Sequence, residues 1–194
     1  MVTWYSRAMV TISFIQGEVL FAVAWLAVRV AVCMRRHRMD WGHEARLLLM
    51  YVNLAVILRF TFFPFSRVDG QVQPLVFDLA EMLPLRLNLV PFKQLLWYET
   101  TRDLLINLIG NVAMFVPTGI VLPIVWPRLD RFWKVVPAGM LVSLCIEVLQ
   151  LPFSSRGTDV DDLLLNTLGV TIGYVLFSLA RGLRAKGDSS CKLN

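Results

Sequence analysis

Apolar residues fill five separate stretches of the chain, and charged or turn-forming residues bound each stretch. A helix needs about 20 consecutive apolar residues to cross the hydrocarbon core of a bilayer, and each stretch is near that length. The predicted fold is therefore an all-α, polytopic membrane helix bundle. The five spans are expected at Ser13 to Met34, Leu47 to Phe65, Leu104 to Trp126, Val135 to Phe153, and Leu163 to Ala180.

The connection between the second and third spans is long and unusually apolar for a loop. It runs from Ser66 to Thr101 and contains several leucines together with Trp97 and Tyr98. Because Trp and Tyr favour the membrane interface, we expect this outer loop to lie there. Asp69-Gly70 is typical of a tight turn and predicts a short hairpin around it.

The basic residues sort by side of the membrane. Four Lys or Arg residues lie between 35 and 46, three between 127 and 134 and four after 180, so eleven share one side, against six on the other. Lys and Arg concentrate in cytoplasmic loops, which predicts an outer N-terminus and a cytoplasmic C-terminus. We expect an N-terminal helix with a basic cytoplasmic loop over 1–46, a membrane domain over 47–180 and a cytoplasmic tail over 181–194.

Composition narrows the class of protein further. Hydrophobic residues make up 57% of the chain and charged residues 17%, with a net charge of +5. Since the positive charges follow the membrane topology, we expect membrane lipid and not nucleic acid as the partner. Both histidines lie on the predicted cytoplasmic side, away from the acidic loops. We therefore expect no metal ligand set of zinc type and no cofactor, while an oxygen-ligated divalent cation stays open.

Polar side chains form stripes on three of the predicted helices. In the third span Asp103, Asn107 and Asn111 recur every four residues, which places them on one helix face. The fourth span carries Glu147 and Gln150 on one face. Asp159, Asp162 and Asn166 follow the same rule in the fifth span, with Asp161 beside them. All of these positions are expected in the outer half of the bilayer.

Simpler explanations exist for most of these residues. Asp159, Asp161 and Asp162 are also typical of helix caps and of charges favoured at a positive helix end, with Thr158 and Asp161 as a capping pair. Thr100 and Asp103 allow the same explanation for the third span. The amides are also typical of hydrogen bonds between membrane helices, and Gly169 with Gly173 of close helix packing. Capping does not account for Glu147 or Gln150, and hydrogen bonding between helices does not require carboxylates, so a clustered site facing outward explains the set better.

Arg59 and Glu147 are expected at the same depth of the membrane. A buried charge there is costly unless it finds a partner, and we expect the two to pair. Without a cation nearby, Glu147 would favour its protonated form and suit proton handling. Arg156, in the short loop beside the acids, either contacts an anion or neutralises the carboxylates.

A short motif recurs in the chain. DLLINLIG at 103–110 returns as DLLLNTLG at 162–169, and each copy begins a helix entering from the outer side. Parallel repeated units occur in transport proteins, although shared capping chemistry produces the same pattern.

Five strings together resemble the VanZ-like family of bacterial membrane proteins over about residues 47 to 180. They are RFTFFP at 59–64, NLVPFK at 88–93, NLIGNVAMFVPTG at 107–119, EVLQ at 147–150 and RGTDVDDLLLNTLG at 156–169. The resemblance implies a bacterial plasma-membrane protein, and the founding member of the family is associated with low-level resistance to the glycopeptide teicoplanin. Its matching polar positions here are Asn88, Lys93, Asn107, Asn111, Glu147, Gln150, Arg156, Asp159, Asp161, Asp162 and Asn166.

The favoured functional hypothesis is a cell-envelope protein whose outer polar site binds a headgroup, a lipid-linked cell-wall precursor or a glycopeptide. Lys93 and Arg156 would contact the anion, and the ligand-binding set also includes Arg59 and Asp103. Two alternatives stay open. One is a membrane enzyme with Glu147, Asp159 or Asp162 as general acid or base on a lipid-linked substrate, and the other is a proton-coupled transporter.

Overall fold

The structure is a computed structural model, and it describes residues 10–36, 39–63, 67–68, 71–72, 74–78, 87–92, 100–153 and 158–191. Five helices dominate these ranges, and all five are long and apolar enough to cross a membrane. They confirm the predicted all-α bundle. The helices are α1 (Phe14–Arg36), α2 (Trp41–Phe62), α3 (Thr101–Val125), α4 (Phe132–Gln150) and α5 (Val160–Cys191).

Helix α2 begins well before the predicted second span because its start depends on capping, which hydrophobic content does not reveal. The Asp40 carboxylate accepts a hydrogen bond from the N–H of His43 at 3.1 Å, and Glu44 stands in the first turn. A side-chain acceptor at this position satisfies a free backbone donor and fixes the helix start. Trp41 is therefore the first helical residue.

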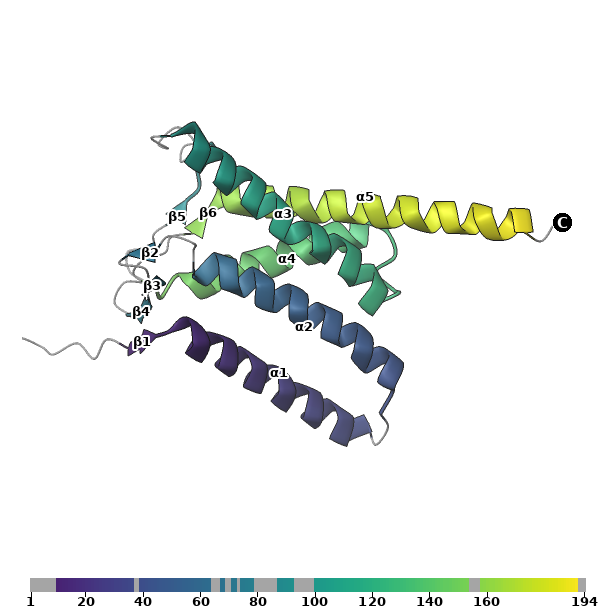
Figure 1. The fold of residues 1–194 in the computed structure, drawn as a ribbon, viewed down its shortest axis with the longest axis horizontal. Coiled ribbons are helices and arrows are strands. Elements are labelled where there is room, and N and C mark those ends of the chain that lie inside the picture. The colour runs from purple at the N-terminus through teal and green to yellow at the C-terminus, as the bar shows by residue number, and fades with distance from the viewer. Residues whose placement is uncertain are drawn as a thin grey trace, which may run out of the picture.

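Helix α5 continues through most of the residues predicted as a tail, ending at Cys191. Its 32 residues correspond to about 48 Å at 1.5 Å per residue, more than the roughly 30 Å of a hydrocarbon core. Figure 1 shows α5 reaching beyond the other helices at the end where the C-terminus lies.

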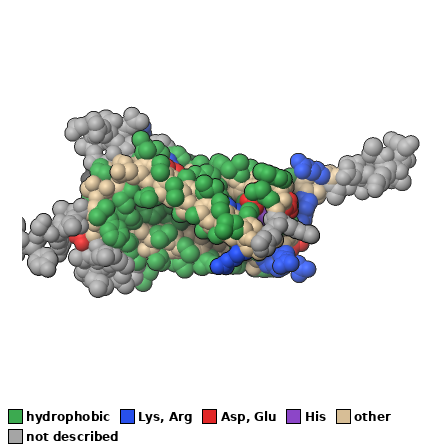
Figure 2. All heavy atoms as spheres, turned by 90° about the horizontal axis from the view of Figure 1, so that it is seen from below, with side chains coloured by type: hydrophobic (Ala, Val, Ile, Leu, Met, Phe, Trp, Pro, Cys, Tyr) green, Lys and Arg blue, Asp and Glu red, His purple; other side chains and the backbone are tan. Residues whose placement is uncertain are grey.

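The bundle is built around the pair α3 and α5. Helix α4 packs against both, α2 packs on α3, and α1 packs mainly against α2 at the edge of the molecule (Figure 1). The buried core contains Ile57, Phe115, Val135 and Val170, each with no exposed surface. The apolar side chains on the outside form a broad belt between the two ends of the molecule (Figure 2). Such an apolar surface is what a bilayer requires.

Short strands gather at the end of the bundle opposite the C-terminus (Figure 1). β1 (Val10–Ile12) pairs antiparallel with β4 (Leu75–Phe77), and β2 (Arg67–Val68) pairs antiparallel with β3 (Gln71–Val72). The second pair flanks the predicted turn, although Asp69 and Gly70 lie outside the described residues. β5 (Leu87–Asn88) pairs in parallel with β6 (Thr158–Asp159), directly before α5.

Glycines let α3 and α5 approach closely. A Cβ placed on Gly173 would lie 1.9 Å from the carbonyl oxygen of Val116, and one on Gly169 would lie 2.3 Å from that of Val112. From the other side, a Cβ on Gly119 would lie 2.1 Å from the carbonyl oxygen of Val170. The small-residue packing predicted for Gly169 and Gly173 is confirmed, and it brings the two backbones into contact.

We predict that Gly173→Ala destabilises the protein by about 1–3 kcal/mol, because α3 and α5 must separate to admit the methyl group. Thermal unfolding of the detergent-solubilised protein measures this loss. Gly110→Ala is the matched control, since a Cβ there meets no atom within 4 Å. Equal unfolding temperatures of the two variants would contradict the packing described here.

Candidate functional site

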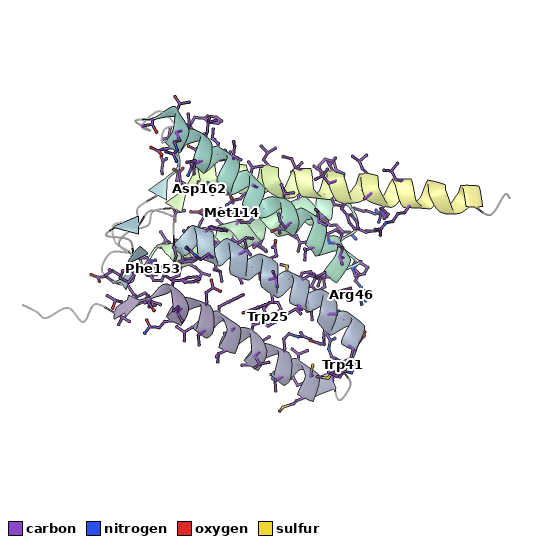
Figure 3. The ribbon with its side chains drawn as sticks, in the orientation of Figure 1. Trp25, Trp41, Arg46, Met114, Phe153 and Asp162 are labelled. Carbon is purple, nitrogen blue, oxygen red and sulfur yellow. The ribbon has the colours of Figure 1, made fainter. Side chains whose placement is uncertain are left out.

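Four elements meet where α5 begins: β5, β6, the last turns of α4 and the first turns of α3. The parallel pairing of β5 with β6 places Asn88 opposite Asp159. Figure 3 shows Asp162 at this end of the bundle, next to the strands. The acidic and amide residues predicted from separate spans therefore come together at the strand end of the molecule.

Asp159 lies at the centre of this cluster and is buried. Its Oδ1 accepts hydrogen bonds from Nδ2 of Asn88 at 3.1 Å and from the N–H of Asp161 at 2.9 Å. Its own N–H donates to Oε2 of Glu147 at 3.3 Å. Through these hydrogen bonds, Asp159 links β5, α4 and the start of α5.

The structure confirms a cap at the start of α5, but Thr158 and Asp161 are not the pair that forms it. The acceptor at the start of α5 is Asp159, whose carboxylate takes the N–H of Asp161. The hydroxyl of Thr158 instead donates to the backbone carbonyl of Glu147 at 3.0 Å. The strand pairing at β6 explains the shift, because it holds Thr158 in extended backbone beside α4 and leaves Asp159 as the last residue before the helix.

Asp161 holds the segment that follows β5. Its Oδ1 accepts a hydrogen bond from the backbone N–H of Phe92 at 2.7 Å, while its Oδ2 is buried and has no hydrogen-bond partner within the described ranges. Phe92 has a φ of 65°, a backbone conformation that non-glycine residues rarely adopt. Surrounding contacts must hold such a residue in place, and the Asp161 carboxylate is one of them.

Asn111 and Asp162 link α3 to α5. The Nδ2 of Asn111 donates to Oδ1 of Asp162 at 2.6 Å. One helical turn deeper, the Nδ2 of Asn166 donates to the Ser143 hydroxyl at 2.9 Å and so joins α5 to α4. Asn166 is almost fully buried, and its Oδ1 has no partner among the described residues.

Glu147 is 3% exposed and lies among other carboxylates, with Asp159 and Asp162 near enough to interact with it electrostatically. The expected ion pair with Arg59 is not formed: within the described chain, the side chain of Glu147 has only the N–H of Asp159 as a hydrogen-bond donor. The interior of the cluster is therefore rich in carboxylates.

Arg59 faces α1 and not the cluster. Its guanidinium lies 4.6 Å from the centre of the Phe14 ring, donates to the carbonyl of Phe63 and interacts electrostatically with Glu18. Depth alone misled the prediction. The buried side chain of Ile57 points into the bundle. Arg59 lies two residues further along α2, so its side chain points about 200° away from that direction.

Gln150 ends α4 with a hydrogen bond from its Nε2 to the carbonyl of Thr61 at 2.9 Å. It thus fastens α4 to α2 beside the cluster. A second buried contact joins Asn53 of α2 to Thr118 of α3, where Nδ2 donates to Oγ1 at 2.9 Å. This pair was not predicted from the sequence. Asn53 is nevertheless a polar residue inside an apolar span, which indicates a position that faces the bundle interior.

The remaining predicted residues divide into two groups. Asp103 is exposed and takes part in the cap of α3, where Thr100 accepts its N–H at 3.1 Å and donates to its carboxylate at 2.7 Å. This confirms the capping explanation for that pair. Asn107 is partly exposed on α3. Lys93 and Arg156 lie outside the described residues.

The two copies of the repeated motif have different surroundings. Asp103 is an exposed capping residue, whereas Asp162 receives the Asn111 amide. Gly110 has open space around it, whereas Gly169 touches the α3 backbone. The copies therefore share helix direction and sequence but perform different structural tasks.

The acidic residues do not converge as ligands for a metal ion. No three His, Cys, Asp or Glu side chains are arranged to hold one anywhere in the described ranges. Instead, the carboxylates accept hydrogen bonds from amides and backbone N–H groups. This arrangement provides a buried set of hydrogen-bond acceptors that anchors the segment from Leu87 to Phe92.

A bundle of apolar helices with this cluster at one end defines a multi-pass membrane protein. The family model described as VanZ/LLP1 matches residues 48–181, and the chain belongs to this family. It is also similar to Protein VanZ of Enterococcus faecium, with 30% identity over 94 residues, which are 48% of this chain and 53% of that protein. The chain thus aligns with about half the length of this curated relative. No solved structure matches the chain.

We predict that Asp161→Ala releases the segment around Phe92, because the N–H of Phe92 loses its acceptor. Cleavage by chymotrypsin after Phe92, which is exposed, should become faster, and the free energy of unfolding should fall by about 1–3 kcal/mol. Asp103→Ala is the control, as it removes an exposed carboxylate outside the cluster. If both variants are cleaved at the wild-type rate, Asp161 does not hold the segment.

Proposed function

We propose that the protein acts at the bacterial plasma membrane and lowers susceptibility to teicoplanin-type glycopeptides. In this proposal the strand end of the bundle faces outward and recognises the anionic part of a headgroup, a lipid-linked cell-wall precursor or the glycopeptide itself. Family membership supports the link to glycopeptides. The excess of Lys and Arg at the opposite end supports the orientation, with an outer N-terminus and a cytoplasmic C-terminus.

A reporter that is active only in the cytoplasm, fused after Asn194, tests that orientation. The fusion should be active, because the proposed orientation places the C-terminus in the cytoplasm.

One observation carries the proposal: buried carboxylates hold an exposed outer segment in place. Asp159 and Asp161 accept hydrogen bonds from Asn88 and Phe92, which are 71 and 69 residues away in the sequence. Between these anchors the side chains of Leu89 and Val90 are exposed, as is that of Phe92. A surface that is apolar, exposed and rigidly anchored is suited to contact a lipid-linked ligand.

The cationic residues of the proposed site adjoin the anchored positions in the sequence. Lys93 directly follows Phe92, and Arg156 lies two residues before Thr158. Arg binds phosphate or carboxylate through two parallel hydrogen bonds, and Lys adds a point charge. In the proposal these two residues contact the anion, while the buried acids and amides fix the backbone that carries them.

We predict that Arg156→Ala and Asp162→Ala each abolish glycopeptide tolerance while the level of protein in the membrane stays normal. The first removes the proposed anion contact, and the second removes the acceptor of the Asn111 amide. The minimal inhibitory concentration of teicoplanin, measured with and without expression, tests this. Asp103→Ala should retain full tolerance. Unchanged tolerance in well-expressed Arg156→Ala and Asp162→Ala would refute the proposed site.

The position of Glu147 favours a second candidate function, acid–base chemistry on a lipid-linked substrate. A buried carboxyl beside two further carboxylates, Asp159 and Asp162, is a common arrangement for a general acid or base. If the protein is an enzyme, it should turn over a purified lipid precursor, and Glu147→Gln should abolish that turnover. Glu147→Gln keeps the size of the side chain and an oxygen that can accept the N–H of Asp159, so we expect it to fold about as stably as the wild type. Binding of the precursor without turnover would exclude this alternative and support recognition.

A further inference from the structure

A second site lies at the other end of the molecule, between the inner ends of α1 and α2. Here the ends of the two helices line a cavity of about 430 Å³ that is open on one side and within the size range of small-ligand pockets. Its polar lining consists of Arg29, Cys33, Arg36, Asp40, His43 and Glu44. Arg46 and Trp41 in Figure 3 mark this end of α2, far along the bundle from Asp162.

Both acidic residues of the cavity, Glu44 and Asp40, already have hydrogen-bond partners within the protein. Nε of Arg29 donates to Oε2 of Glu44 at 3.0 Å, and a second bond of the same ion pair joins the guanidinium to Oε1. The Asp40 carboxylate accepts the N–H of His43 in capping α2. Arg29 is thus already paired, and the two acids form no hydrogen bond with the side chains of Arg36 and His43.

Two donors in the cavity remain available. In the described chain, the side chains of Arg36 and His43 form no hydrogen bond or ion pair, and both line the cavity. The surrounding segment is basic, with five arginines against two acids between residues 29 and 46. The local field therefore favours an anion.

The remaining lining and the location indicate which kind of anion fits. Val32 and Met39 give the cavity an apolar part beside its cationic groups. Figure 2 shows the basic side chains at this end directly beside the apolar belt that faces the bilayer. Basic pockets between helices at a membrane surface bind anionic phospholipid headgroups, whose acyl chains can remain against the apolar belt.

We propose that this cavity binds the phosphate of an anionic phospholipid, with Arg36 and His43 as its donors. The bound headgroup joins α1 to α2 at their inner ends. Helix α1 gains most from such a link, since none of its apolar window is buried and it packs mainly against α2. The lipid is a structural ligand of the N-terminal hairpin, separate from the ligand of the outer cluster.

Native mass spectrometry of the full-length protein with added phosphatidylglycerol tests the proposal. The wild type should bind one molecule preferentially over phosphatidylcholine, and Arg36→Gln with His43→Gln should weaken this binding about fivefold or more. Arg35→Gln is the charge-matched control for Arg36→Gln, because both arginines are exposed in the same helical turn and only Arg36 lines the cavity. Equal losses in Arg35→Gln and Arg36→Gln would overturn the proposal, as would equal binding of phosphatidylcholine.

A second measurement uses the unaltered cavity and stays informative if the double variant fails to fold. Cys33 lines the cavity, so a variant with Cys145→Ser and Cys191→Ser carries one thiol as a probe. Phosphatidylglycerol should slow modification of Cys33 by a maleimide several-fold, and phosphatidylcholine should not. Equal protection by inorganic phosphate would show a site for free phosphate and overturn the lipid assignment. An unchanged rate in phosphatidylglycerol would overturn the proposal outright.

Discussion

The structure depends on one constraint, that polar groups inside an apolar bundle must bond to one another. Water is absent from the hydrocarbon region, so each buried carboxylate or amide that finds no partner costs several kcal/mol. The chain meets this constraint by pairing acids with amides and backbone N–H groups, as Asp159 does with Asn88 and Asp162 with Asn111. These bonds join helices and strands far apart in sequence, and they fix the geometry of the strand end.

The position of the polar cluster also requires the close contact between α3 and α5. The bond between Asn111 and Asp162 spans these two helices, and the glycine contacts deeper in the bundle hold their backbones together. The polar cluster and the glycine packing are therefore parts of one interface. The position of the carboxylates follows from the approach of two backbones as much as from their own hydrogen bonds.

Hydrophobic length was sufficient to predict that five spans exist, although α2 starts earlier and α5 ends later than predicted. Glu147 and Gln150 are both buried on α4, as their spacing predicts, whereas Asp103 of the α3 stripe is exposed. Periodicity gives no information on which helix lies opposite a face, and for this reason Arg59 was assigned to Glu147 although it faces Phe14 and Glu18. The bond from Asp161 to Phe92 was also beyond prediction, since it depends on a backbone N–H that every residue possesses.

The start of α5 has an electrostatic consequence. This helix begins at Val160, so the positive end of its macrodipole lies beside Asp159, Asp161 and Asp162. That end contributes the equivalent of about half a positive charge, which partly balances carboxylates crowded into a small volume. The helix thereby offers the acids a counter-charge that requires no basic side chain.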